Sequence, residues 1–303
     1  MKNKRKSLKK LVSNVEQFTT IWGARHWASL FLQEHGCEKG VADILLMHLL
    51  SMSQSQLLAA MQDDFPQDIQ ETFMEGIYQH VDKGTPVQHL IGYEYFYGRK
   101  FAVNPHVLIP RPETEELVEL VLREIKAGFS KDDEILVVDI GTGSGIIGIT
   151  LKKELPALHV KAVDISKDAL QTAKQNAQDL NADVEFVEGD FLSPLVESGQ
   201  RVDVIVSNPP YISPEDETSL DDVVRKHDPK LALFAEDEGL AAYKKIVSQL
   251  PEVMNRPALV AFEIGHQQGV AVQEIIKHKF PKAEPKVMQD INQKDRIVYS
   301  WMK

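Results

Sequence analysis

The residues in this chain best suited to chemistry are Asn208-Pro209-Pro210-Tyr211, which directly follow the apolar run Val204-Ile205-Val206-Ser207. An asparagine amide oxygen and a proline carbonyl both accept hydrogen bonds, and the two prolines, which lack N–H groups, stiffen the turn that presents these acceptors. Such a turn is suited to holding an NH₂ group while its nitrogen attacks an electrophile. The alternative is an ordinary Asn-Pro turn without chemistry.

A second stretch, Asp139-Ile140-Gly141-Thr142-Gly143-Ser144-Gly145, has the composition of a cofactor loop. Glycines let the backbone turn sharply and approach a ligand closely, and the following helix offers free N–H groups. With Gly148 the stretch also fits the dinucleotide fingerprint G-x-G-x-x-G. Two details favour S-adenosylmethionine (SAM). Asp139 stands where it would meet a cationic or hydrogen-bonding cofactor group, and Gly141 directly follows the strand, so the dinucleotide register would start two residues late.

Two acidic residues downstream are further candidates for cofactor binding. Asp164 ends the next predicted strand, and an acid about 20 residues beyond such a loop accepts ribose hydroxyls in nucleotide-binding folds. The alternative is a cap for the following helix, a role that Ser166 can fill instead. After the third strand, Asp190 would meet the adenine amino group and Phe191 would stack on the ring, although a phenylalanine here is also typical of a core.

Together these stretches predict methyl transfer from SAM to a planar amino or amide nitrogen. An amide nitrogen is a poor nucleophile because its lone pair is delocalised into the carbonyl. If the Asn208 side-chain oxygen and the Pro209 carbonyl accept its two hydrogens, the lone pair is directed at the methyl group. Those hydrogen bonds strengthen as positive charge develops on nitrogen, which stabilises the transition state selectively. Tyr211 would pack its ring on the flat substrate group.

The length of 303 residues allows one large domain and a small one. Residues 11–83 place apolar side chains at helical spacing and predict a small helical bundle, in which Ser53 caps one helix and Pro66 opens another. Residues 84–110 are rich in aromatic and β-branched residues and predict a β-hairpin linker. The expected domains are therefore 1–83, 84–110 and 111–303.

The third segment alternates between strands and helices. It opens with a helix at Pro110-Arg111-Pro112-Glu113. The predicted strands are 135–140, 160–163, 184–187, 202–206, 259–264 and 296–301, and the predicted helices run from the glycines to 154 and over 167–180, 240–250 and 267–279. This alternation predicts an α/β fold with a doubly wound sheet that binds ligands at the carboxyl ends of its strands. The long charged segment 212–234 is interpreted as a loop that closes over substrate or orders on binding it.

Charge and cysteine content limit the partners and the location. The net charge is −11 although six of the first ten residues are basic, so the rest of the chain is more acidic still. A nucleic-acid enzyme normally carries a basic face, so no direct nucleic-acid binding is expected, and the basic leader, residues 1–10, is interpreted as a solvated end. The single cysteine, Cys37, excludes an internal disulfide and argues against a cysteine-cluster zinc site, so no metal and a cytoplasmic location are expected. No apolar run has the length of a membrane helix or follows the basic start as in a signal peptide.

Several stretches of the chain resemble the release factor glutamine methyltransferases. They are the loop Asp139–Gly145, the turn Asn208–Tyr211, and the stretches Pro86-Val87-Gln88-His89-Leu90-Ile91-Gly92 and Leu108-Ile109-Pro110-Arg111-Pro112-Glu113-Thr114-Glu115. The resemblance covers about residues 20–303. The turn alone is shared with DNA adenine-N6 methyltransferases, whereas the Ile-Pro-Arg-Pro-Glu-Thr-Glu stretch separates this chain from ribosomal-protein glutamine methyltransferases.

The resemblance implies a seven-stranded SAM-dependent methyltransferase sheet and methylation of the side-chain nitrogen, N5, of the glutamine in the Gly-Gly-Gln motif of peptide chain release factors. It implies that the SAM contacts are Gly141, Thr142, Gly143, Ser144, Gly145, Asp164 and Phe191, and that Asn208–Tyr211 hold the substrate glutamine, with Asn208 at both ligands. The N-terminal helical domain is a candidate for substrate recognition. Phe191 stands where some members have Trp, and Asp228-Pro229 stands where Glu-Pro is common.

Other functions remain open at this stage. They are glutamine methylation of a ribosomal protein, adenine-N6 methylation of nucleic acid, a nicotinamide-dependent oxidoreductase that uses the glycine loop, and a non-enzymatic SAM-binding scaffold.

Overall fold

A computed structural model of the chain describes residues 18–220 and 222–303. The chain divides into two compact units, one that ends at Ile91 and one that runs from Gly92 to Lys303. The basic leader and the first residues of the predicted helical segment, 11–17, lie outside the described residues. The predicted linker 84–110 spans the division between the units.

The first unit is helical, in agreement with its apolar spacing. Its elements are α2 (Ile21–Glu34), α3 (Gly40–Leu50), α4 (Gln54–Ala59), the 3₁₀ turn η1 (Gln67–Ile69), α5 (Gln70–Lys83) and α6 (Val87–Ile91). Ser53 caps α4 through a capping box with Gln56, which confirms the predicted cap. Pro66 precedes η1, so the helix that it was expected to open begins only at Gln70. The core of this unit is apolar and includes Leu32, Leu46, Phe73 and Ile77.

The second unit is built on a seven-stranded mixed sheet with the order β5-β4-β3-β6-β7-β9-β8. Its strands are β3 (Leu136–Ile140), β4 (His159–Asp164), β5 (Glu185–Glu188), β6 (Val202–Ser207), β7 (Met254–Glu263), β8 (Lys286–Gln289) and β9 (Asp295–Met302). The strands from β5 to β7 pair in parallel, and β9 is antiparallel to both of its neighbours. The α/β prediction is confirmed, although the residue pattern alone had indicated only six of the strands and had missed β8.

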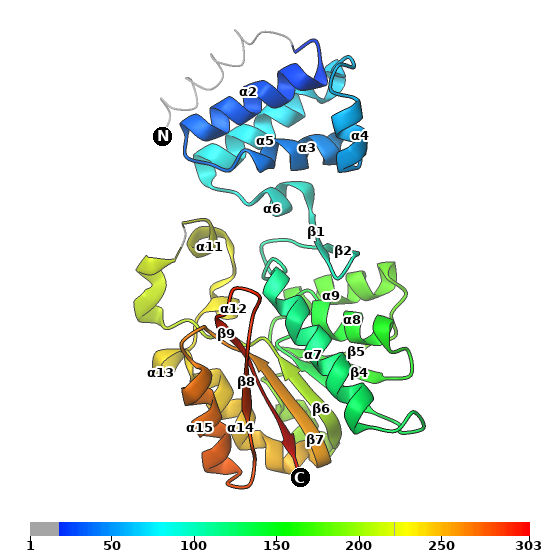
Figure 1. The fold of residues 1–303 in the computed structure, drawn as a ribbon, viewed down its shortest axis with the longest axis vertical. Coiled ribbons are helices and arrows are strands. Elements are labelled where there is room, and N and C mark those ends of the chain that lie inside the picture. Colours follow the sequence, from blue (N-terminus) through cyan, green and yellow to red (C-terminus); the bar gives the residue numbers. More distant parts are fainter. Residues whose placement is uncertain (1–17, 221) are drawn as a thin grey trace. The chain divides into compact units, whose positions relative to one another are not determined.

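Helices cover both faces of this sheet (Figure 1). One face packs against α7 (Pro112–Gly128), α8 (Ile146–Glu154) and α9 (Lys167–Asp179), and the other against α10 (Ser193–Ser198), α14 (Ala241–Val253) and α15 (Gly269–Lys279). Successive side chains of a strand point to opposite faces. In β6, accordingly, Val204 belongs to the first core and Ile205 to the second. Burial on both faces explains why the strands read as continuous apolar runs.

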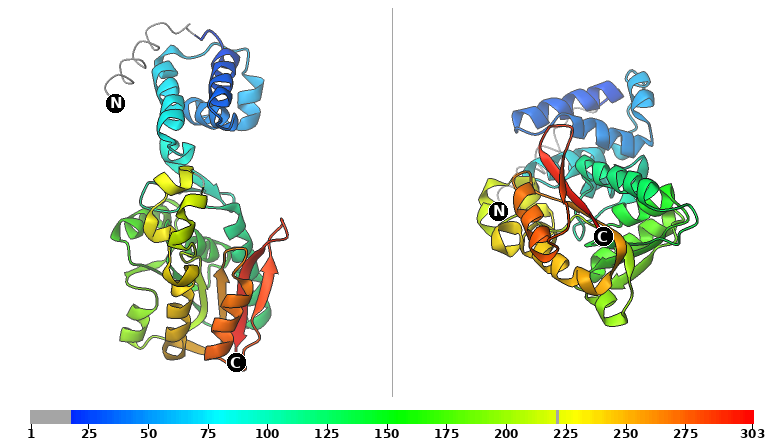
Figure 2. Two further views of the ribbon diagram at one scale, coloured as in Figure 1. Left: turned by 90° about the vertical axis from the view of Figure 1, so that its left-hand side faces the viewer. Right: turned by 60° about the horizontal axis from the view of Figure 1, so that its bottom comes forward.

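Two smaller features complete the second unit. The strands β1 (Tyr93–Phe96) and β2 (Arg99–Ala102) form the predicted antiparallel hairpin. The segment 212–234 contains η2 (Pro214–Ser219), α11 (Asp222–His227) and α12 (Lys230–Leu233), and α13 (Glu236–Gly239) follows it. The base of this segment is closed, because the Ile212 N–H donates to the Leu233 carbonyl and the Ala235 N–H donates to the Ile212 carbonyl. Because β9 is antiparallel to β7, the last residues of β9 lie at the amino ends of the parallel strands. Figure 2 (left view) places segment 212–234 at the opposite end of the sheet, where the parallel strands have their carboxyl ends.

Candidate active site

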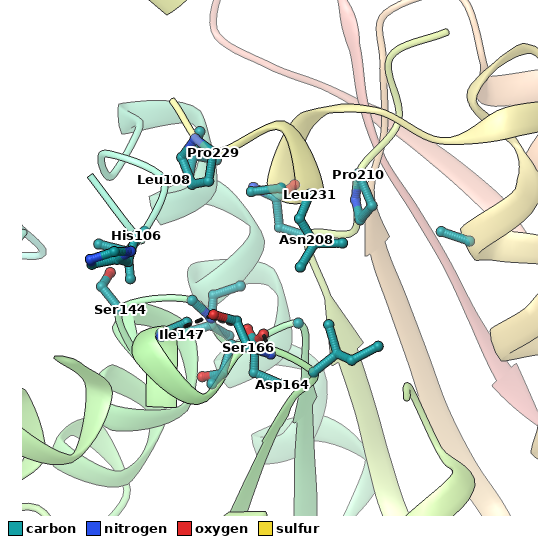
Figure 3. A pocket seen from close by; sticks show the side chains of 18 of the residues that line it. His106, Leu108, Ser144, Ile147, Asp164, Ser166, Asn208, Pro210, Pro229 and Leu231 are labelled. Carbon is teal, nitrogen blue, oxygen red and sulfur yellow. Dashed lines mark hydrogen bonds between the residues drawn. The ribbon is translucent and has the colours of Figure 1, made fainter. Parts of the chain in front are cut away.

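A pocket of about 480 Å³ opens at the carboxyl ends of β3, β4, β5 and β6. Pockets of about 300–1,000 Å³ are typical of small-molecule sites. The chain runs from β3 through β4 to β5 on one side of the sheet and then returns to β6 on the other side of β3. The pocket therefore lies at the topological switch point, where doubly wound sheets bind their ligands. Figure 3 places Asp164 and Ser166 across this pocket from Pro229 and Leu231.

The glycine loop presents open backbone to the pocket. Gly141 has a φ of +67° and Gly143 a φ of +57°, and a Cβ atom added to either would meet no atom within 4 Å. A side chain at these positions would be strained and would project into open space. Gly145 is required for a different reason, since a Cβ there would lie 2.6 Å from Cδ1 of Ile149. Thr142 and Ser144 line the pocket as well, whereas Gly145 does not.

Asp139 organises the loop from behind. Its Oδ2 atom accepts hydrogen bonds from Thr142 Oγ1 at 2.6 Å and from the Gly148 N–H at 2.9 Å. The side chain is fully buried, and burial raises the pKa of Asp139 to about 6. Asp139 is not part of the pocket lining. The structure therefore gives it a role within the loop in place of the direct cofactor contact expected from its position.

Asp164 lies at the pocket with both oxygens held by backbone groups. Oδ2 accepts from the Gly143 N–H at 2.8 Å, and Oδ1 accepts from the Ser166 N–H at 2.9 Å. Burial raises the pKa of this carboxyl above its ordinary value. Ser166 caps α9 through the Ala169 N–H, so the helix does not need Asp164 as its cap. A carboxylate has about four acceptor positions, so capacity remains for ligand hydroxyls.

Asp190 and Phe191 line the pocket together with a residue that the sequence did not indicate. Lys245, on α14, forms an ion pair with Asp190, and its ammonium nitrogen lies 5.6 Å from the centre of the Phe191 ring. All three residues belong to the pocket lining. Lys245 has no local motif around it, so only the packing of α14 against this edge of the sheet reveals it.

The Asn-Pro-Pro-Tyr turn divides between the pocket and the core. Asn208 and Pro210 line the pocket, whereas Pro209 and Tyr211 do not. The Tyr211 ring packs against the core that contains α14 and α15, and burial raises its pKa to about 12. Its backbone carbonyl accepts a hydrogen bond from Gln268 Nε2 at 3.0 Å. The structure thus uses Tyr211 to anchor the turn and does not place its ring on the wall where a flat substrate group was expected.

Behind Asn208 lies a buried polar chain. Asn208 Nδ2 donates to Thr114 Oγ1 at 3.3 Å, and Thr114 Oγ1 donates to Glu263 Oε2 at 2.7 Å. Glu263 ends β7 and is only 2% exposed, and burial raises its pKa to about 7. Thr114 was expected only as part of the family stretch Leu108–Glu115, and Glu263 was not among the predicted site residues. The available signal was an acid at the end of an apolar strand.

An ion pair fixes one wall of the pocket. Arg111 Nη2 lies 3.0 Å from Asp228 Oδ2, and the Asp228 side chain is 2% exposed while that of Arg111 is 42% exposed. Arg111 stands at the start of α7, and Asp228 directly precedes Pro229, where the pocket-lining residues of segment 212–234 begin. The pair therefore joins this segment to the body of the second unit.

Across residues 18–220 and 222–303, the structure contains no group of three or more His, Cys, Asp or Glu side chains arranged to hold a metal ion. In the same described ranges, no helix is both long enough and apolar enough to cross a membrane.

The pocket fits a nucleoside cofactor such as SAM. The open glycine backbone leaves room for close approach, and the Asp164 carboxylate has acceptor capacity left for sugar hydroxyls. Phe191 offers a flat apolar ring for a base. These features lie at the carboxyl ends of the neighbouring strands β3, β4 and β5.

Comparisons with known proteins identify related families. Residues 23–92 match the PrmC N-terminal domain, and residues 119–227 match the methyltransferase small domain. The release factor glutamine methyltransferase of Bacillus cereus is 47% identical over 282 residues, which cover 93% of this chain and 99% of the relative. That of Bacillus subtilis is 47% identical over 279 residues, which cover 92% and 96%. The solved structure of the hMettl16 catalytic domain in complex with the MAT2A 3'UTR hairpin 6 has a TM-score of 0.50 at 15% identity, over 78% of this chain and 82% of that chain, and supports the fold alone.

Proposed function

The chain belongs to the release factor glutamine methyltransferase family, and from this premise we propose that it transfers a methyl group from SAM to N5 of the glutamine in the Gly-Gly-Gln motif of peptide chain release factors. One observation carries the proposal. The glycine loop after β3 and the Asn208 turn after β6, which follow adjacent parallel strands, line the same pocket. A nucleoside cofactor and an amide nitrogen can therefore meet there.

The family membership also decides among the alternatives that the sequence left open. A nicotinamide-dependent oxidoreductase and a non-enzymatic scaffold have no place in a methyltransferase family. Methylation of a ribosomal protein or of adenine becomes an outcome of the experiment below.

We assign the cofactor side of the pocket to the loops after β3, β4 and β5. When bound, SAM supplies an electrophilic methyl group on its sulfonium sulfur. Gly141–Ser144 form the cradle, Asp164 accepts the ribose hydroxyls, and Phe191 lies against the adenine ring. Asp190 reaches the adenine amino group only in competition with Lys245, its present partner.

We assign the substrate side to Asn208 and Pro209. The Asn208 side-chain oxygen accepts one hydrogen of the glutamine amide at the pocket wall. Pro209 lies outside the pocket lining, so its carbonyl accepts the second hydrogen only if the substrate glutamine reaches past Asn208 along the turn. The two hydrogen bonds together orient the amide nitrogen. Amide nitrogen is weakly nucleophilic, but both hydrogen bonds strengthen as the nitrogen becomes positive, so they stabilise the transition state more than the bound substrate. The amide proton becomes acidic once the nitrogen has reacted, so no strong base is required beforehand. Pro210 and Tyr211 stiffen and anchor the turn.

The experiment that tests this function measures the transfer of labelled methyl from SAM to three acceptors. They are a purified release factor, the same factor with the glutamine of its Gly-Gly-Gln motif replaced, and duplex DNA. Label on the intact factor alone is the expected result. Label on the altered factor at the same level would move the acceptor to another residue, and label on DNA would favour the adenine alternative.

A further inference from the structure

We propose that Glu263 is a positioning residue for methyl transfer: through Thr114 it fixes the Asn208 side-chain amide so that its oxygen, and not its NH₂ group, faces the substrate. The inference rests on the proposed function, because it explains how Asn208 presents an acceptor to the glutamine amide. It assigns roles to two buried residues that the expected catalytic turn does not include.

The three residues meet because their elements are adjacent. Asn208 directly follows β6 and Glu263 ends β7, and these strands are paired in parallel with Ser207 opposite Phe262. Asn208 and Glu263 therefore occupy equivalent places at the same edge of the sheet. Thr114 reaches them from the first turn of α7, and it is fully buried, as is Glu263.

The direction of the hydrogen bonds follows from the chemistry of the groups. An ionised carboxylate only accepts, so Thr114 must donate its hydroxyl proton to Glu263 Oε2, which lies 2.7 Å away. The Thr114 oxygen is then left as an acceptor, and only the NH₂ end of Asn208 can satisfy it, at 3.3 Å. The same end of the Asn208 amide also interacts with the Glu263 carboxylate directly and lowers its pKa. With its nitrogen committed to Thr114 and Glu263, the Asn208 amide carries its oxygen on the opposite side.

The opposite amide orientation would be unproductive. An Asn208 NH₂ group that faced the glutamine NH₂ would bring two donors together, so the substrate amide would lose the acceptor that aligns its nitrogen. The hydrogen-bond chain Asn208–Thr114–Glu263 is called the relay below. A carboxylate at its end only accepts, so every hydrogen bond of the relay must point from Asn208 towards Glu263, and the opposite amide orientation is excluded. A glutamine or a protonated glutamic acid at position 263 can donate as well as accept, and so permits both.

The charges around Glu263 support a relay that operates in the ionised form. Arg296 on β9 favours the carboxylate, whereas Glu113 on α7 opposes it. The Tyr243 hydroxyl donates to the Glu263 backbone carbonyl at 2.9 Å, and the charge of Glu263 raises the pKa of both Tyr211 and Tyr243. Burial is the largest influence and raises the pKa to about 7. A buried carboxylate lowers the stability of the fold, and a functional need for a group that only accepts hydrogen bonds would explain why it is present here.

The test compares Glu263→Gln with the wild type on the intact release factor. We expect kcat to fall about 10- to 100-fold, the scale of one well-placed hydrogen bond to a charged or developing charge. The SAM dissociation constant and the melting temperature should change little. The matched control is Asp203→Asn, which removes a carboxylate from β6 whose partners are the Leu136 N–H and the Asn255 side chain, away from the pocket. It should leave kcat unchanged.

The pH profile separates positioning from mere support of the fold. In the wild type, kcat should decline as the pH falls below about 7, where Glu263 becomes protonated. This decline at low pH should be absent in Glu263→Gln, because a glutamine side chain permits both orientations of the Asn208 amide at every pH. A variant with the wild-type kcat, or one with lowered kcat but an unchanged decline at low pH, would overturn the inference.

A second pair of variants decides the matter if Glu263→Gln does not fold. Thr114→Ser keeps the hydroxyl of the relay and should retain most of the wild-type kcat, whereas Thr114→Val keeps the shape and should lose kcat about 10-fold or more. Equal kcat in the two variants would exclude a relay through Thr114. The two proposals fail in different ways. If the wild-type protein does not methylate the intact release factor, the proposed function is wrong. If the wild-type protein does methylate it and the variants at positions 263 and 114 have the same kcat, only the relay is wrong.

Discussion

Asp164 accepts a hydrogen bond from the backbone N–H of Gly143, with 2.8 Å between the nitrogen and Oδ2. Gly143 belongs to the loop that follows β3, and Asp164 is the last residue of the adjacent strand β4, so this bond ties the loop to the end of β4. The second oxygen of Asp164 accepts from the Ser166 N–H. The backbone of the loops after β3 and β4 thus sets the orientation of the carboxylate in advance of any ligand, which reduces the ordering that binding requires.

Asp164→Ala should weaken SAM binding more than it lowers kcat at saturating SAM. Loss of the carboxylate removes acceptors for the ribose hydroxyls and releases the Gly143 N–H, and hydrogen bonds to charged groups contribute about 1.5–3 kcal/mol each. We therefore expect the SAM dissociation constant, measured by titration calorimetry, to rise about 10- to 100-fold. Asp179→Ala, at the last residue of α9 and outside the pocket lining, is the control. Unchanged SAM affinity in Asp164→Ala would contradict the assignment.

Alanine at the glycines of the loop should separate binding from stability. Gly143→Ala adds a methyl group in open space at positive φ, so it should weaken SAM binding and cost about 1–2 kcal/mol of stability. Gly199→Ala, also at positive φ with open space but away from the pocket, should cost a similar stability without an effect on SAM. Gly145→Ala should cost more, because its Cβ meets Ile149. Equal SAM affinity for the variants at 143 and 199 would be evidence against the cradle.

Asn208→Ala should reduce turnover and leave SAM affinity nearly intact. Removal of one donor or acceptor that stabilises developing charge typically lowers kcat about 100- to 1,000-fold. Asn255→Ala, on β7 with Asp203 as its partner, makes the same substitution outside the pocket and should leave kcat unchanged. The measurements are steady-state methylation at saturating SAM and a separate binding titration. A parallel loss of SAM affinity would mean that Asn208 supports the cofactor pocket.

Asp139→Asn should flatten the pH dependence of stability. The pKa of Asp139 is raised by burial from an ordinary value of 3.8 to about 6, so the folded state binds this proton more tightly than the unfolded chain. The stabilising contribution is therefore complete below about pH 4 and is lost as the pH rises through about 6, an effect of up to roughly 3 kcal/mol. Urea unfolding at pH 4 and pH 7 measures it. Asn can keep both bonds now accepted by Oδ2, and an unaltered pH slope in the variant would rule out Asp139 as its source.

Much of the fold followed from the sequence because its signals are local. Apolar runs bounded by glycines and acids marked the strands that are buried on both faces, and Ser53 and Ser166 marked helix starts through side chains that cap their own backbone. The strands β5 and β8 are equally short, equally exposed and both at an edge of the sheet. Val184, Phe186 and Val187 marked β5 in the sequence, whereas β8 has only Val287 and Met288 as apolar residues and so escaped. The helices of segment 212–234 escaped because they are short, and charged residues there masked any period.

The sequence predicted those site residues that directly follow or end a strand. The glycines, Asp164 and Asn208 lie at strand ends, which could be located from the strands themselves. Lys245, Thr114 and Glu263 join the site through packing of distant elements, and no spacing along the chain reveals such contacts. Asp139 was expected at the cofactor and Tyr211 at the substrate, but neither lines the pocket. Both side chains pack into the protein interior, and such tertiary packing is not visible in the local sequence.

The position of β9 between β7 and β8 has a consequence for how the protein is made. This strand is synthesised after both of its neighbours, yet it pairs with each of them in the sheet. Until residues Asp295–Met302 have left the ribosome, β7 has an unpaired edge, and such edges invite pairing with other chains. The nascent second unit therefore keeps an exposed strand edge until β9 is added, and a truncation that removes β9 would make this exposure permanent.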